Sequence, residues 1–155
     1  KDGTHVVIAR PFNHTGPGQS MGFFVPTVVH QLAEIVAGRG EAILKLGNLS
    51  AKRDMSDVRD VVRAYPALLR SGVSGEAYNV GTGIGWRMRD IVALAQRISG
   101  VTAEIVGEPT RKRASDVPEL VADLSRLRET IDWTPQFGLE RTIRDMFQAE
   151  SALAS

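Results

Sequence analysis

An unbroken apolar run, Val6–Ala9, comes directly before a polar stretch that extends from Arg10 to Gln19. Apolar residues without alternation are typical of a strand that is buried on both faces, and the Gly and Pro residues that follow mark a loop. In open α/β sheets, ligands bind just beyond the carboxyl ends of such strands. The pattern therefore predicts a doubly buried strand that leads into a ligand-binding loop.

Apolar residues at helical spacing predict several helices farther along the chain. These stripes lie within residues 25–36, 58–69, 91–98, 124–131 and 139–147. Pro66 falls inside the second stripe. Because a proline removes a backbone donor and crowds the carbonyl four residues earlier, we expect that helix to be kinked or shortened.

Shorter apolar segments between the helical stripes predict strands at residues 42–48, 76–80 and 101–106. We find no internal repeat and no long linker. The alternation of strands and helices indicates an α/β fold in which helices outnumber strands, and it favours one compact unit.

Composition excludes several classes of function. The chain has 155 residues, of which 43% are apolar and 24% charged, and its formal net charge is +1. This balance gives no field that would favour nucleic acid or a membrane surface. The chain has no cysteine and three scattered histidines, so we expect neither disulfides nor a metal site. No apolar run approaches about 18 residues and no signal peptide is evident, so we expect a cytoplasmic protein.

The beginning of the chain is unusual. It starts at Lys1 without an initiator Met and enters the strand pattern within a few residues. A parallel strand needs neighbours on both sides. We therefore expect the chain to be the C-terminal portion of a longer protein.

Three polar segments each follow apolar structure and could form one anion site. They are Asn13-His14, Lys52-Arg53-Asp54, and Arg111-Lys112-Arg113 with Asp116. Guanidinium groups match the oxygens of a diphosphate, and an Asn side chain can bind a sugar or a base. The alternative is that these segments are solvated surface loops. His14 could move a proton, or it could simply be hydrogen-bonded to the backbone.

Gly81-x-Gly83-x-Gly85 lies between a predicted strand and a predicted helix. A dinucleotide fingerprint places its third glycine one position later, so a strand-to-helix turn with permissive glycines is the simpler interpretation. Nothing in the chain resembles the sequence context of an activated nucleophile.

An ordered set of motifs resembles the C-terminal half of the extended short-chain dehydrogenase/reductases, the NAD-dependent epimerase/dehydratase superfamily. The motifs lie within Ala9–Gln19, Leu46–Asp54, Asp57–Tyr65, Tyr78–Gly83 and Asp116–Pro118. Within that superfamily the chain resembles the GDP-6-deoxy-D-mannose reductases first and the GDP-mannose 4,6-dehydratases second. The resemblance covers essentially all 155 residues.

The resemblance implies a fold and an activity. Residues 1–155 would form the nucleotide-sugar-binding portion of such an enzyme, with residues 1–13 as a strand of its Rossmann sheet and the rest as the last strands and a small helical lobe. The parent enzyme would reduce GDP-4-keto-6-deoxymannose to GDP-6-deoxymannose, with NADP or NAD bound mainly by an N-terminal domain absent from this chain. The Ser/Thr, Tyr and Lys of the family precede the first motif, so the resemblance places no catalytic residue in this chain and implies that the chain alone is inactive.

The resemblance also implies site residues and partners. Asn13 would contact the sugar-diphosphate, and Arg53 and Arg113 would bind the diphosphate or ribose. Asp116 would hold a ribose hydroxyl or orient Arg113, and His14 would lie near the nicotinamide. The partners would be a GDP-sugar and the N-terminal Rossmann domain, in cis or in trans. A dehydratase, an epimerase, a non-catalytic nucleotide-binding module and a homo-oligomer that pairs through an exposed sheet edge remain alternatives.

Overall fold

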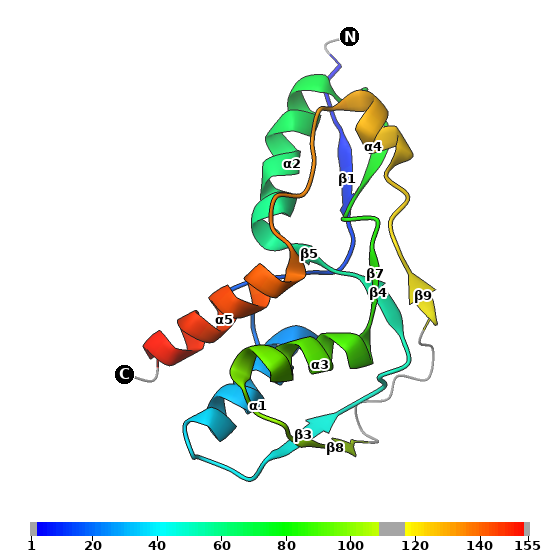
Figure 1. The fold of residues 1–155 in the computed structure, drawn as a ribbon. Coiled ribbons are helices and arrows are strands. Elements are labelled where there is room, and N and C mark those ends of the chain that lie inside the picture. Colours follow the sequence, from blue (N-terminus) through cyan, green and yellow to red (C-terminus); the bar gives the residue numbers. More distant parts are fainter. Residues whose placement is uncertain (1–2, 109–116, 154–155) are drawn as a thin grey trace.

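The computed structural model describes residues 3–108 and 117–153 (Figure 1). The helices in these ranges are α1 (Phe24–Val36), α2 (Val58–Ser71), α3 (Met88–Ser99), α4 (Ser125–Thr130) and α5 (Leu139–Leu153). The strands are β1 (Ile8–Pro11), β2 (His14–Thr15), β3 (Ile43–Leu46), β4 (Lys52–Asp54), β5 (Ser56–Asp57), β6 (Ala77–Val80), β7 (Gly85–Arg87), β8 (Glu104–Gly107) and β9 (Glu119–Leu120). The predicted α/β class and all five predicted helices are confirmed.

The strands form several small sheets. Strands β1 and β6 pair in parallel, as do β2 with β5 and β3 with β8. Strand β4 lies between antiparallel β7 and parallel β9. The segments predicted as strands at 42–48 and 76–80 contain β3 and β6, and the segment at 101–106 overlaps β8. Strands β2, β4, β5, β7 and β9 have two or three residues and were not predicted.

Two hydrophobic cores stabilise the two ends of the molecule. In the first, α1, α3 and α5 pack together with β3 around residues that include Leu32, Ile91 and Ile143. In the second, α2 and α4 pack with β6 around Leu68 and Tyr78. Figure 1 shows these two groups at opposite ends of the chain's long axis. Of the residues predicted to bind a ligand, Asn13, His14 and Arg53 lie in the segments between these two groups.

Within the described residues, strand β1 is partly covered on one face and exposed on the other, so the predicted burial on both faces is not found there. Val7 and Ala9 pack against the second core, whereas Val6 and Ile8 are 52% and 45% exposed. Successive side chains on a strand point to opposite faces, and within the described residues β6 and α2 cover one edge and one face of β1. The apolar run therefore presents one apolar face to solvent.

Helix α2 is not shortened by Pro66. It runs for 14 residues, and Pro66 lies inside it. The carbonyl that loses its donor belongs to Val62, which lies on the exposed side of the helix, where water can bind it. The helix is also fixed at its start, because the Asp57 carboxylate accepts a hydrogen bond from Arg59 N at 2.8 Å.

None of the helices in the described ranges is long and apolar enough to cross a membrane.

Candidate functional site

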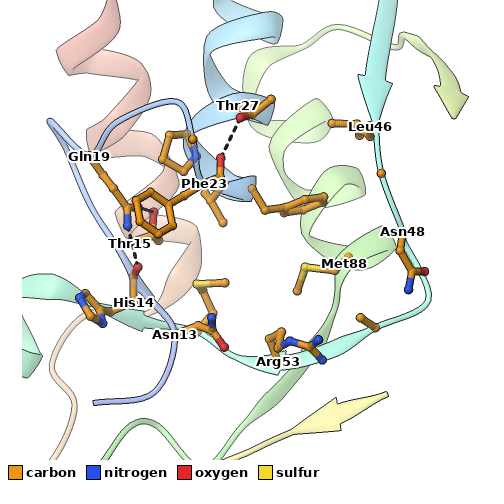
Figure 2. A pocket seen from close by; sticks show the side chains of 17 residues that line it. Asn13, His14, Thr15, Gln19, Phe23, Thr27, Leu46, Asn48, Arg53 and Met88 are labelled. Atoms are coloured by element: carbon orange, nitrogen blue, oxygen red, sulfur yellow. Dashed lines mark hydrogen bonds between the residues drawn. The ribbon is translucent and has the colours of Figure 1, made fainter. Parts of the chain in front are cut away.

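A cavity of about 420 Å³ lies between the start of α1, the end of β3 and β4 (Figure 2). Residues 13–15, 22–27 and 46–48 form most of its walls. The walls are completed by Gln19, Ala51, Arg53, Met55 and Met88. The volume falls within the range of about 300–1,000 Å³ that small-molecule sites occupy. The fold thus brings Asn13, His14 and Arg53 to one cavity.

A second cavity of about 560 Å³ lies at the carboxyl ends of β1 and β6. Its walls include Arg10 and Asn79, which are paired in the register of these two strands. The two cavities share four lining residues: Asn13, His14, Gln19 and Phe23. A ligand longer than one cavity can therefore extend along this shared wall from the first cavity into the second.

The loop that forms the shared wall is held by its own hydrogen bonds. Thr15 Oγ1 donates to Gln19 Oε1 at 2.8 Å, and Gln19 Nε2 donates to the His14 carbonyl at 3.1 Å (Figure 2). The Asn13 carbonyl accepts from Ser56 N at 2.9 Å, which fixes the backbone of Asn13 to β5. The exposed Asn13 side chain is thus presented from a fixed backbone to both cavities.

His14 is hydrogen-bonded to the backbone, which is one of the two roles that the sequence left open for it. Its Nδ1 lies 2.9 Å from the Phe12 carbonyl. A carbonyl oxygen only accepts, so Nδ1 carries the hydrogen. This bond fixes the ring orientation, and Figure 2 shows the imidazole pointing away from the side of the cavity where Asn48 and Met88 lie.

Arg53 faces the first cavity because of the alternation of β4. Lys52, one residue earlier, pairs with Glu119 at 2.8 Å, and Asp54, one residue later, is buried. Side chains alternate along a strand, so the side chain of Arg53 points the other way, to the cavity. Its Nη1 donates to the Lys52 carbonyl at 2.9 Å. The other two predicted substrate residues, Arg113 and Asp116, lie outside the described residues.

The glycine turn that resembled a dinucleotide fingerprint is occupied by the chain's own Asp54. This buried carboxylate accepts from Thr82 N at 2.9 Å, Thr82 Oγ1 at 2.6 Å, Gly83 N at 2.8 Å and Ala122 N at 3.2 Å. A Cβ on Gly81 would lie 2.6 Å from Asp54 Oδ2. The glycines therefore permit close approach of an internal carboxylate, and this turn does not fit a dinucleotide diphosphate.

Asp57 and Asp60 connect α2 to the segment that contains α5. Asp57 accepts from Thr142 Oγ1 at 2.7 Å and pairs with Arg59 at 2.7 Å. Asp60 accepts from the backbone N–H of Gln136 and Phe137. Both are buried. The segment Asp54-x-x-Asp57-x-x-Asp60 thus provides three structural carboxylates directly after Arg53, which lines the cavity.

Asp57 makes stability depend on pH. Burial alone would raise the pKa of its carboxyl, but hydrogen bonds from Arg59 and Thr142 outweigh burial and lower the pKa below its ordinary value of 3.8. The unfolded chain therefore binds more protons, and the stabilisation is present above pH 3.8 and is lost as the pH falls through the folded pKa. We expect urea unfolding to show that Asp57→Asn costs stability at pH 7 and that the difference from wild type shrinks toward pH 3. An unchanged difference between pH 7 and pH 3 would contradict this assignment.

The polar side chains that line the first cavity could bind an anion and hydroxyl groups. The lining combines a guanidinium group with amide and hydroxyl groups, and within the described residues no group of side chains could hold a metal ion. Sequence reasoning missed several lining residues, among them Phe23, Thr27, Asn48 and Met88. The signal at Phe23 was a large aromatic residue two positions before the predicted helical stripe at 25–36, and therefore outside the apolar pattern of that helix.

Comparison with known proteins gives a consistent result. A sequence model of the family described as GDP-mannose 4,6 dehydratase matches residues 1–146. The chain is 35% identical over 143 residues to the GDP-6-deoxy-D-mannose reductase of Pseudomonas aeruginosa, covering 92% of this chain and 47% of that protein. It is 30% identical over 138 residues to the GDP-6-deoxy-D-talose 4-dehydrogenase of Aggregatibacter actinomycetemcomitans, covering 89% and 45%. The chain thus spans about half the length of the curated relatives it matches.

Among solved structures, the chain is similar to RMD from Pseudomonas aeruginosa complexed with NADPH. The TM-score is 0.90 at 31% sequence identity, over 96% of this chain and 49% of that one. The predicted similarity to one part of a Rossmann-type enzyme of the epimerase/dehydratase superfamily is confirmed.

Proposed function

The chain belongs to the GDP-mannose 4,6-dehydratase family, and from this premise we propose that it binds a GDP-linked sugar as the substrate-binding portion of an NAD(P)-dependent nucleotide-sugar reductase. The reaction we propose is the conversion of GDP-4-keto-6-deoxymannose to GDP-6-deoxymannose. The observation that carries the proposal is the cavity of about 420 Å³ where Asn13 and Arg53 meet. The identity to a GDP-6-deoxy-D-mannose reductase supports the choice of substrate.

The nucleotide end of the substrate would occupy the first cavity. Arg53 lines it, and a guanidinium group binds diphosphate oxygens through two parallel hydrogen bonds. Asn13, on the wall shared with the second cavity, would contact the sugar next to the diphosphate. We propose Arg113 as a second diphosphate or ribose contact and Asp116 as its partner on the ribose.

The reacting carbon would then lie toward the second cavity, at the carboxyl ends of β1 and β6. Ligands of open α/β sheets bind at this edge. Residues 1–13 would contribute one strand of the parent enzyme's Rossmann sheet, and His14 would lie near the nicotinamide end.

The nicotinamide cofactor would supply the hydride in such a reductase. The described glycine turn does not fit its diphosphate, because Asp54 already accepts from the turn's N–H groups. We therefore assign cofactor binding and proton transfer mainly to the half of such an enzyme that this chain does not cover. The 155 residues alone are proposed to bind substrate without converting it.

The second candidate function is that of a GDP-mannose 4,6-dehydratase. It is favoured by the description of the matching family, and it uses the same nucleotide end of the substrate. The two candidates therefore predict the same binding in this chain.

Calorimetric titration of the protein with GDP and with NADP tests the proposal. We expect GDP to bind with a stoichiometry near one and NADP to produce no saturable heat. Saturable binding of NADP without binding of GDP would overturn it. Binding of GDP with no loss of turnover when this chain is deleted from a reconstituted enzyme would instead favour a non-catalytic binding module.

A further inference from the structure

Phe23 is a large apolar residue that the fold leaves largely uncovered. Its exposed fraction is 58%, whereas the neighbouring Phe24 packs against the first core. Phe23 lines both cavities and lies on the wall that they share. In Figure 2 it stands on the side of Gln19 and Thr15, with Leu46 and Asn48 on the other side of the cavity.

The structural role of Phe23 is performed by its backbone. It is the residue before α1, and its carbonyl accepts from Thr27 N at 3.1 Å and from Thr27 Oγ1 at 2.8 Å. Its side chain makes no capping hydrogen bond. Helix formation and core packing therefore do not account for the aromatic ring, which costs free energy where it meets water.

The rest of the shared wall is polar. Asn13, His14 and Gln19 surround the same junction, so a ligand there meets amide and imidazole groups beside an aromatic face. A hexose has hydroxyl groups that can hydrogen-bond to the polar side chains, and it has a C–H surface that can pack against the aromatic ring. In a 6-deoxyhexose, the methyl group at C6 extends this apolar surface.

The position of the shared wall indicates that it contacts the sugar of the ligand rather than the base. Arg53 lines the first cavity and is absent from the second, so a diphosphate bound by Arg53 lies in the first cavity, where the proposed function also places the base. The hexose then follows the diphosphate along the shared wall toward β1 and β6. Two relatives of the chain are named for 6-deoxyhexoses linked to GDP.

This inference rests on the proposed function: we propose that Phe23 determines specificity for a 6-deoxyhexose. Its ring packs against the apolar C5–C6 edge of the sugar and disfavours a hydroxyl group at C6. The guanosine and diphosphate contacts do not involve this ring.

The test uses calorimetric titration with GDP, GDP-mannose and GDP-6-deoxymannose, the last two of which differ by one oxygen at C6. A hydroxyl group against a partly exposed apolar wall should weaken binding about tenfold, the lower end of the discrimination that such contacts give. Wild type should thus prefer GDP-6-deoxymannose to GDP-mannose about tenfold. Phe23→Ala should reduce this preference to less than about twofold while GDP affinity stays within about twofold of wild type. Phe23→Leu should keep part of the preference.

Val36→Ala is the matched control, because Val36 has the same 58% exposure at the other end of α1 and lines neither cavity. It should leave all three affinities unchanged. A preference that survives Phe23→Ala, or a wild type without preference, overturns the role of Phe23 while GDP binding still supports the proposed function. A loss of GDP affinity in Phe23→Ala equal to the loss for the sugars also overturns it, since the ring would then contact the base. Failure of wild type to bind GDP at all overturns both.

Discussion

Replacing Asp54 with alanine is expected to lower the free energy of unfolding by about 3–5 kcal/mol, the range for removing one partner of a buried charged network. The Asp54 carboxylate is fully buried and accepts hydrogen bonds from three backbone N–H groups and one hydroxyl. These donors belong to the turn after β6 and to Ala122, so a single side chain joins β4 to two distant segments. Alanine would leave the N–H groups of Thr82, Gly83 and Ala122 without their acceptor.

Urea unfolding followed by the fluorescence of the buried Trp133 measures this effect. Asp54→Asn keeps the volume but presents an amide donor to some of the same N–H groups, so we expect it to be destabilising as well. Asp132→Ala is the matched control, because Asp132 is exposed, and it should change stability by less than about 0.5 kcal/mol. If Asp54→Ala were as stable as Asp132→Ala, the role assigned to Asp54 would be wrong.

The helices could be predicted because periodicity is a local property. Each apolar stripe, such as that of α1 or α5, records which face of the helix meets the core. The strands β4, β5, β7 and β9 could not be predicted, since they have two or three residues and are polar in part. Their pairing depends on partners far away in the sequence: Arg53 pairs with Trp86 and with Leu120.

Polar side chains of the candidate cavity could be inferred from the sequence, whereas the contacts that shape the cavity could not. Arg53 and Asn13 were inferred from polar segments that follow apolar structure, and the fold brings both to one cavity. The sequence alone does not show which of Arg53 and Asp54 faces the cavity. Side chains alternate along β4, so Arg53 faces the cavity and Asp54 points into the interior. Phe23 was missed for the same reason: its exposure follows from its position before the first turn of α1.

The burial of β1 was overestimated for a related reason. A run of apolar residues indicates that both faces avoid water, but it does not say which part of the molecule covers each face. In the described residues Val7 and Ala9 have a core beneath them, whereas Val6 and Ile8 do not. Pro66 illustrates the opposite case, because the exposed side of α2 tolerates a missing donor that a buried helix would not.

Replacing Arg53 with alanine is expected to weaken GDP binding about 10- to 100-fold, since a hydrogen bond to a charged group contributes about 1.5–3 kcal/mol. The expectation follows from the place of Arg53 in the first cavity, on the face of β4 opposite to Lys52. Stability should change less than in Asp54→Ala, because Arg53 is half-buried at the cavity wall rather than enclosed. Urea unfolding of Arg53→Ala checks that any loss of affinity arises in a folded protein.

The central proposal is that Arg53 of this chain binds the diphosphate of a GDP-sugar. Calorimetric titration of GDP into wild type, Arg53→Ala and Lys52→Ala tests it most directly, because the two variants lose the same charge from adjacent residues of β4. Lys52 pairs with Glu119 and does not line the cavity, so Lys52→Ala should bind GDP within about twofold of wild type. We predict a loss of about 10- to 100-fold in Arg53→Ala alone. Equal GDP affinity in all three proteins, or an equal loss in both variants, would contradict the claim.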